Sequence, residues 1–268
     1  MISVIWIWFL TFFITPQEKP TIDVYQVEKG RYVEVWAKNS HFYPVTVHLD
    51  VEEENMKSDR VIPLTTVVPH NTEKLLTRMY PGDPQQPWEY RTKYASYMGD
   101  IFAKPDKNFA YRLPYKLGDT FKVTQSYGGE FSHFDVLEYS LDFDLPEGTP
   151  VLAARGGMVV GVKEDSDEGG ASRIYEDQAN FVTILHSDGT FADYSHLQLN
   201  SVKVKIGDSV REGQLLGLSG STGFVTGPHL HFDVKMVQEG GKYVTIPVKF
   251  ATKEGTIELQ EKESYTGW

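Results

Sequence analysis

Two histidines, His229 and His231, lie two residues apart in the segment 227–233, which reads GPHLHFD. In a β-strand, residues i and i+2 point to the same face of the sheet, so the two imidazoles share one face while Leu230 turns toward the core. Two imidazoles on one face can hold a zinc ion or act as an acid–base pair. The pair alone is a weak signal, because surface hairpins also contain it.

A third histidine, His133, precedes an alternating segment, EYSLDFDL, at residues 138–145. Its apolar residues form one face of a strand, and Asp142 lies on the polar face. Asp142 can therefore meet His133 and His231 at a metal, and a solvent-exposed acidic face is the alternative interpretation. Asp144 shares the face of Asp142, and Asp135 follows His133 closely.

A fourth histidine, His196, lies in the segment 194–197, which reads YSHL and ends a predicted strand. A single histidine in a strand is more often structural than catalytic. His186 belongs to no such segment, and we interpret it as structural.

Taken together and in this order, these segments resemble the lysostaphin-type (LytM-like) zinc metallopeptidases. The pattern of that family is a His with a downstream Asp, then Y-x-H-L, then a Gly-rich stretch that closes on P-H-L-H-F. The connecting segments 146–155 (PEGTPVLAAR) and 217–223 (GLSGSTG) match as well. The resemblance covers residues 115–237, roughly half of the chain.

The resemblance implies that His133, Asp142 and His231 bind Zn²⁺, with a water in the fourth position, and that His196 and His229 are catalytic. Three protein ligands leave zinc open, and the metal lowers the pKa of its water to about 7. One neutral imidazole can accept the proton of that water, and another can hydrogen-bond the oxyanion or the leaving amine. The function implied is a zinc metalloendopeptidase that hydrolyses peptide bonds in peptidoglycan stem peptides or cross-bridges.

The sequence departs from the family pattern at one position. Many members place the aspartate four residues after the first histidine, but that position here is Leu137, which cannot bind zinc. The aspartate comes later, at Asp142, as in relatives with a longer loop before it.

The sequence has two alternative interpretations besides a metalloendopeptidase. A non-catalytic LytM-like module that binds or activates a partner hydrolase is expected to lack metal ligands, and this chain keeps all of them. A lipoyl- or biotinyl-type carrier barrel, suggested by residues 204–217, needs an exposed lysine at a hairpin tip. The turn at Asp188-Gly189 offers none.

The elements that must position these residues are strands, and the predicted fold class is all-β. Segments 32–37 and 45–51 alternate apolar and polar residues, which predicts a small N-terminal β-sandwich over residues 21–115. Residues 116–250 are predicted to form the peptidase domain, with a hairpin at Asp188-Gly189 and a strand at 202–210. Residues 251–268 are predicted to form a polar tail after this domain. The resemblance implies an antiparallel β-sheet groove for this domain (a duplicated hybrid motif, related to the barrel-sandwich) with zinc on its floor.

Composition excludes several classes of function. The formal net charge of −11 leaves no basic surface for nucleic acid. The chain has no cysteine, so a metal must bind to His, Asp or Glu. The resemblance implies that the chain acts on a peptidoglycan peptide, and we expect a monomer.

Residues 2–14 are almost wholly apolar and uncharged, and the run is too short for a comfortable membrane span. It predicts a signal peptide or an N-terminal anchor over residues 1–20, and export to the periplasm or the cell envelope. Because no Lys or Arg precedes the run, an uncleaved anchor stays open. Membrane association is expected only through this segment.

Overall fold

The structure is a computed structural model that describes residues 22–129 and 132–268. The expected leader, residues 1–20, lies outside the described residues. None of the helices in the described part of the chain is long and apolar enough to cross a bilayer. They are short 3₁₀ turns: η1 (Asp135–Leu137), η2 (Arg173–Gln178) and η3 (Glu239–Gly241).

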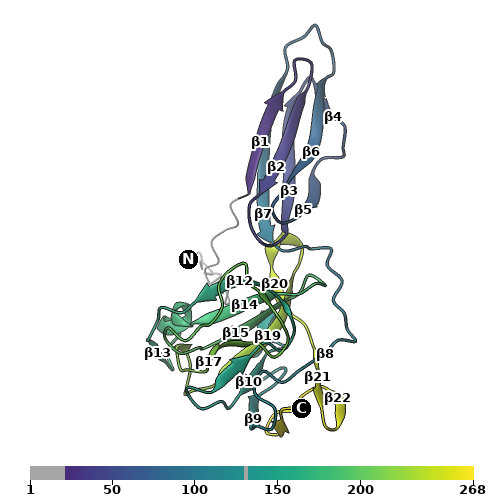
Figure 1. The fold of residues 1–268 in the computed structure, drawn as a ribbon. Helices are drawn as coiled ribbons and strands as arrows, with labels where there is room; N and C mark the ends of the chain where they lie inside the picture. Colours follow the sequence, from purple (N-terminus) through teal and green to yellow (C-terminus); the bar gives the residue numbers. More distant parts are fainter. Residues whose placement is uncertain (1–21, 130–131) are drawn as a thin grey trace, which may run out of the picture.

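The N-terminal part is a small β-sandwich, as predicted (Figure 1). Its strands are β1 (Asp23–Glu28), β2 (Val33–Asn39), β3 (Val45–Glu54), β4 (Met56–Ser58), β5 (Leu64–Val68), β6 (Thr72–Pro81) and β7 (Glu89–Met98). One sheet has the order β1-β2-β6-β4 and the facing sheet β5-β3-β7. The alternation read in the sequence puts Val33, Val35, Val45, Val47 and Leu49 into the core between them.

The C-terminal part is built around one large antiparallel sheet. Its strands and those that pack near it are β8 (Ala110–Tyr111), β9 (Thr120–Gln125), β10 (Leu141–Phe143), β11 (Pro150–Leu152), β12 (Gly157–Lys163), β13 (Gly169–Gly170), β14 (Phe181–Leu185), β15 (Phe191–Ser195), β16 (Ser209–Val210), β17 (Leu215–Leu218), β18 (Gly223–Phe224), β19 (Leu230–Val237), β20 (Tyr243–Thr245), β21 (Lys249–Thr252), β22 (Gly255–Ile257) and β23 (Ser264–Thr266). The large sheet runs β16-β12-β14-β15-β19-β10-β9-β23, and β20 also pairs with β19. The fold class is therefore all-β, as predicted.

The period of two along its strands gives the large sheet one apolar and one polar face. Tyr194, Leu230 and Phe232 are fully buried on the apolar face. The short strands β8, β11, β17 and β21 contribute side chains to the same core, for example Phe250, whose ring centroid lies 5.8 Å from that of Phe232. The polar face is left open, and it carries the residues described in the next subsection.

The predicted hairpin is present, but the predicted strand at residues 202–210 is mostly not. β14 and β15 pair across the Asp188-Gly189 turn, and Gly189 has the positive φ of 83° that this turn requires. Of residues 202–210, only Ser209–Val210 pair as a strand, with β12. The residues before them have alternating exposure but make only isolated backbone hydrogen bonds, such as that from the amide of Lys203 to the carbonyl of Leu216 in β17, and no ladder.

The last residues, 251–268, pack against the C-terminal part instead of extending as a polar tail. β23 pairs with β9 at the edge of the large sheet. Leu259 and Tyr265 are buried in the same core, and the hydroxyl of Tyr115 donates a hydrogen bond to the carbonyl of Tyr265 at 2.8 Å. The apolar residues among the charges are what anchor this segment.

The chain enters the C-terminal core before residue 116. β8 pairs with β21, and Tyr111 and Leu113 belong to the C-terminal core. The last strand of the sandwich, β7, ends at Met98. The segment that links the two parts therefore lies between residues 99 and 109.

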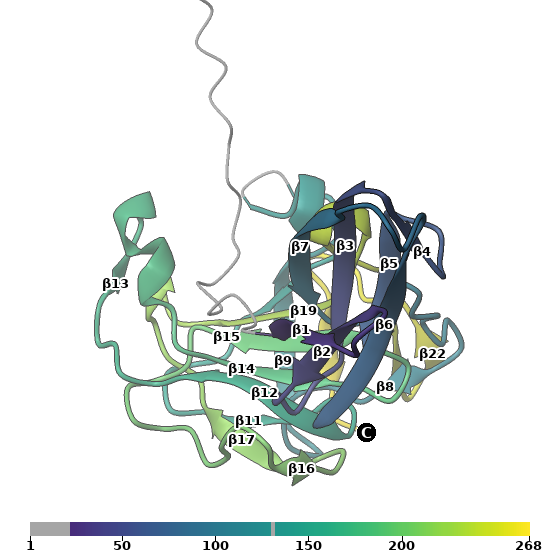
Figure 2. The same cartoon turned by 90° about the horizontal axis from the view of Figure 1, so that it is seen from above.

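The sandwich is packed tightly onto one end of the large sheet (Figures 1 and 2). Phe191 and Val160 are buried among sandwich residues, and the hydroxyl of Tyr243 donates to the carbonyl of Met98 at 2.7 Å. Gly99 lies at the junction with a φ of +102°, and a Cβ added to it would lie 2.9 Å from the ring of Phe191. The junction thus depends on a residue without a side chain.

We predict that Gly99→Ala destabilises the protein by more than the backbone strain alone. Alanine at positive φ costs about 1–2 kcal/mol, and overpacking against Phe191 adds about 1–3 kcal/mol. Gly118→Ala is the matched control, because Gly118 has a φ of +86° with nothing within 4 Å of its added Cβ. Urea unfolding of both variants measures the difference. Equal losses in the free energy of unfolding would show that the close packing at Gly99 adds nothing to the destabilisation.

Candidate metal centre

The register of the large sheet brings side chains from four strands into one row on its polar face. Asp142 in β10 lies directly opposite His231 in β19, and on its other side it pairs with Gln125 in β9. His231 in turn lies opposite Ser195 in β15. Side chains directly opposite each other have Cβ atoms about 4.5–5.5 Å apart. The sheet itself therefore puts the carboxylate of Asp142 beside the imidazole of His231.

His133 reaches the same place from the loop after β9. It is fully buried, and its Nδ1 donates to the carbonyl of Ser126 at 3.0 Å. Its other nitrogen, Nε2, is then the atom that is left to bind a metal. This buried Nε2 lies 3.3 Å from Oδ1 of Asp142 yet makes no hydrogen bond. A buried polar nitrogen without a hydrogen-bond partner is costly, and a metal ion would satisfy it.

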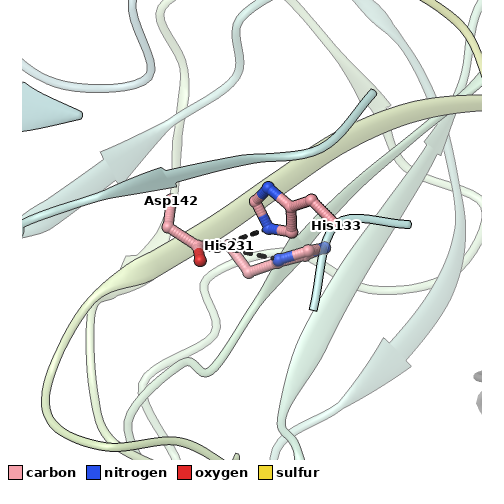
Figure 3. Close-up of side chains that lie close together, drawn as sticks. All are labelled: His133, Asp142 and His231. Atoms are coloured by element: carbon pink, nitrogen blue, oxygen red, sulfur yellow. Dashed lines mark hydrogen bonds and ion pairs between the residues drawn. The ribbon is translucent and has the colours of Figure 1, made fainter. Parts of the chain in front are cut away.

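The three side chains converge with the geometry that a metal needs. Figure 3 shows both imidazoles directed at the Asp142 carboxylate, and the ligand atoms of the three residues all lie within 4.8 Å of one another. Nδ1 of His231 lies 2.9 Å from Oδ1 of Asp142. Atoms about 2.1 Å from a tetrahedral zinc lie about 3.4 Å from each other, so small shifts would complete such a site. The residues present fit a divalent metal.

The other two carboxylates weighed from the sequence are not part of this cluster. Asp144 lines the cleft on the same face as Asp142 but two residues further along. Asp135, in η1, makes an ion pair with Lys242 at 3.2 Å. The structure brings together Asp142, His133 and His231.

The charges in the cluster attract a cation. Burial would raise the pKa of Asp142, but the imidazoles of His133 and His231 hold it well below its ordinary value. Burial would lower the pKa of His231, but the carboxylates of Asp142 and Asp233 raise it to about 10. Positive charge is therefore stabilised at Nδ1 of His231, and a metal ion would take the place of that proton.

The remaining two histidines lie next to this cluster. The rings of His196 and His229 have centroids 4.6 Å apart, and Nε2 of His229 lies 3.8 Å from Oδ1 of Asp142. Nδ1 of His196 lies 2.7 Å from the carbonyl of Thr222, and Nδ1 of His229 lies 2.9 Å from the carbonyl of Gly227. Because each Nδ1–H is donated to a carbonyl, each Nε2 can accept a proton.

His196 has an unusual backbone. It follows β15 with a φ of +67°, in the left-handed region that non-glycine residues rarely adopt. Burial, followed by the neighbouring imidazoles of His229 and His231, lowers its pKa well below the ordinary value. His196 is therefore a neutral imidazole, in a conformation of the kind that is concentrated at functional sites.

A cleft of about 650 Å³ lies over the polar face of the sheet and contains all of these groups except the buried His133. Val136 and Leu137 of η1 line it together with residues of β20, and Glu176 and Asp177 line it from η2. In Figure 2 the β13 segment and the sandwich lie at opposite ends of the large sheet.

Three charged residues of the cleft were not singled out from the sequence. Asp233 and Lys235 follow His231 at intervals of two in β19, and Asp193 lies opposite Asp233 in β15. Oδ2 of Asp233 lies 3.4 Å from Nε2 of His231. The alternation of polar and apolar residues in 231–235 could have revealed Asp233 and Lys235, because it places them on the same face of β19 as His231.

Residues 137–245 match the family model of Peptidase family M23. The match includes Asp142, His196, His229 and His231 and begins four residues after His133. The chain is 36% identical to an uncharacterized metalloprotease of Buchnera aphidicola over 123 residues, 46% of this chain and 28% of the relative. It is 32% identical to lysostaphin of Staphylococcus staphylolyticus over 119 residues, 44% of this chain and 23% of the relative.

A third relative is the peptidoglycan DD-endopeptidase ShyA of Vibrio cholerae, 40% identical over 93 residues, 35% of this chain and 19% of the relative. The chain thus spans between 19% and 28% of the length of these relatives. Over residues 137–245, this chain is similar to peptidase family M23.

Proposed function

We propose that the chain is a zinc metalloendopeptidase that hydrolyses peptide bonds in peptidoglycan stem peptides or cross-bridges. The observation that carries the proposal is the convergence of His133, Asp142 and His231 on one point in an open cleft. Two further histidines, each of which donates its Nδ1–H to a backbone carbonyl, lie beside that point. The name of the Vibrio cholerae relative supports peptidoglycan as the substrate.

Zinc is the metal that suits this donor set best. Two imidazole nitrogens and one carboxylate oxygen are typical of catalytic zinc sites, which keep the fourth position open. We assign Nε2 of His133, Nδ1 of His231 and Oδ1 of Asp142 as the ligand atoms. When bound, zinc polarises a carbonyl oxygen and supplies hydroxide near neutral pH.

The remaining chemistry falls to His196 and His229. Hydrolysis needs a group that takes a proton from the attacking water and returns it to the leaving amine. A neutral imidazole that carries its proton on Nδ1 can do both, and a backbone carbonyl accepts the Nδ1–H of each of these rings. A protonated ring can also donate a hydrogen bond to the developing oxyanion. We propose that the two histidines share these roles.

A non-catalytic module that binds or activates a partner hydrolase remains the alternative for this fold. Such a module needs neither metal ligands nor a proton acceptor. The presence of all five histidine and aspartate side chains at one cleft favours the enzyme.

We also propose that the protein is exported and acts in the periplasm or at the cell envelope. Its substrate lies outside the cytoplasm, and residues 2–14 form an uncharged apolar run of the kind that directs secretion. Fractionation of cells that express the native chain should recover it outside the cytoplasm, and mass spectrometry of the N-terminus should reveal a cleaved signal or a retained anchor. Recovery chiefly from the cytoplasm would refute export.

Metal binding is predicted to depend on Asp142 and not on Asp144. Asp142→Asn removes the anionic ligand and should weaken zinc binding by more than about 100-fold. This exceeds the loss of about 10–100-fold in metal affinity that is usual when a residue that only hydrogen-bonds a ligand is removed. Asp144→Asn is the matched control, because it removes the same charge two residues away on the same face. Chelator competition measures the zinc affinity of both variants. The opposite ranking would make Asp144 the ligand.

Activity is predicted to need both the metal and the two neighbouring histidines. The zinc-loaded protein should release soluble peptides from isolated peptidoglycan sacculi, lose this activity on chelation and regain it with zinc. His196→Ala and His229→Ala should keep one zinc per chain and lose about 10²–10⁴-fold in rate, the usual contribution of a proton-transfer group.

Two results would count against this assignment. Loss of zinc from both histidine variants would make these residues ligands. Intact sacculi after treatment with fully zinc-loaded protein would reject peptidoglycan as the substrate.

A further inference from the structure

Three charged side chains, those of Asp193, Asp233 and Lys235, form a buried network next to the metal cluster. His231, Asp233 and Lys235 alternate along β19, so they share the cleft face of the sheet. Asp193 in β15 lies directly opposite Asp233. Asp193 and Asp233 are only 6% and 4% exposed. The metal cluster alone does not require these charges.

Buried carboxylates that face each other directly need a counter-charge. Lys235 supplies it, because its ammonium makes a close ion pair with Asp193 and lies within electrostatic reach of Asp233. The far side of Asp193 is held by the hydroxyl of Thr183, which donates to Oδ1 at 2.7 Å. The network is thereby anchored in the middle of the sheet.

The network ends on the ring of His231. Nδ1 of this ring faces Asp142 at 2.9 Å, and Nε2 on the opposite side faces Oδ2 of Asp233 at 3.4 Å. An imidazole that binds a metal through one nitrogen carries its proton on the other. A carboxylate that accepts that proton fixes the tautomer, orients the ring and makes the ligand more basic.

We propose that Asp233 is a positioning residue that accepts the Nε2–H of His231 and holds Nδ1 toward the metal. Lys235 and Asp193 keep its carboxylate in place within the wall of the cleft. His133 and His231 thus differ in their support, because the Nδ1–H of His133 is donated to a backbone carbonyl. The proposal rests on the metal site of the proposed function.

The test compares zinc dissociation constants of the full-length metal-free protein, Asp233→Leu, Asp233→Asn and Asp144→Asn, by chelator competition. Asp233→Leu removes the acceptor and should raise the dissociation constant about 10–100-fold. Asp233→Asn keeps an acceptor oxygen without the charge, so it should lose less affinity for zinc than Asp233→Leu does. Asp144→Asn removes a cleft carboxylate that does not contact His231 and should bind zinc as the unaltered protein does.

A second readout separates positioning from folding. The melting temperature of metal-free Asp233→Asn should stay near that of the unaltered protein, while its affinity for zinc falls several-fold. The visible absorption spectrum of the Co²⁺-loaded variant should also change, because the orientation of a ligand ring alters the field at the metal. If Asp233→Leu fails to fold, the Asn variant decides by these measurements.

The outcomes distinguish this inference from the function on which it rests. Zinc binding by the unaltered protein, with unchanged affinity and Co²⁺ spectrum in the folded Asp233 variants, would overturn the role of Asp233 alone. Failure of the unaltered protein to bind zinc would overturn the metal site and this inference together.

Discussion

The site depends on one cross-strand pair, Asp142 opposite His231. The β10–β19 register that creates this pair also places Leu141 opposite Phe232 on the other face, where both are fully buried. A slip of one residue would turn the aspartate into the core and the leucine into the cleft. Burial of the apolar face therefore holds the polar face in place.

The site concentrates charge where water is largely excluded. Opposed carboxylates would be unfavourable there without compensation, and each charged group has a partner: Asp142 lies between imidazoles, and Asp193 faces Lys235. The result is a cluster with the carboxylate of Asp142 at its centre and the Asp193–Lys235 ion pair packed beside it. Such a cluster favours a small cation, because the protein has already met the cost of bringing the carboxylates together.

The tautomers of three histidines are set by backbone carbonyls. Ser126, Thr222 and Gly227 each accept the Nδ1–H of one ring, of His133, His196 and His229 respectively. Because these carbonyls belong to loops, the loops have to be as well ordered as the strands. His196 has a positive φ, so local backbone strain is part of how the site is assembled. His231 is different, since both of its nitrogens face carboxylates.

The sequence by itself indicated which residues could meet at the site and determined which faces of the strands carry them. The alternation around His229 and His231 follows from the geometry of a strand, and the order of motifs pointed to His133, Asp142 and His196. The absence of cysteine restricted a metal to imidazole and carboxylate ligands. These are local properties, which a short segment displays whatever surrounds it.

Only the tertiary structure decided how segments distant in the chain are paired. It placed Asp142, and not Asp144 or Asp135, in the cluster, because that choice depends on the register between β10 and β19. It showed Asp233 and Asp193 to be partners in a buried network, although 40 residues separate them in the sequence. It left residues 202–208 without a ladder and packed residues 251–268 into the core. The physical reason is the same in each case: a strand's pattern specifies which side chains share a face, but its partner and register are set by contacts that the segment does not contain.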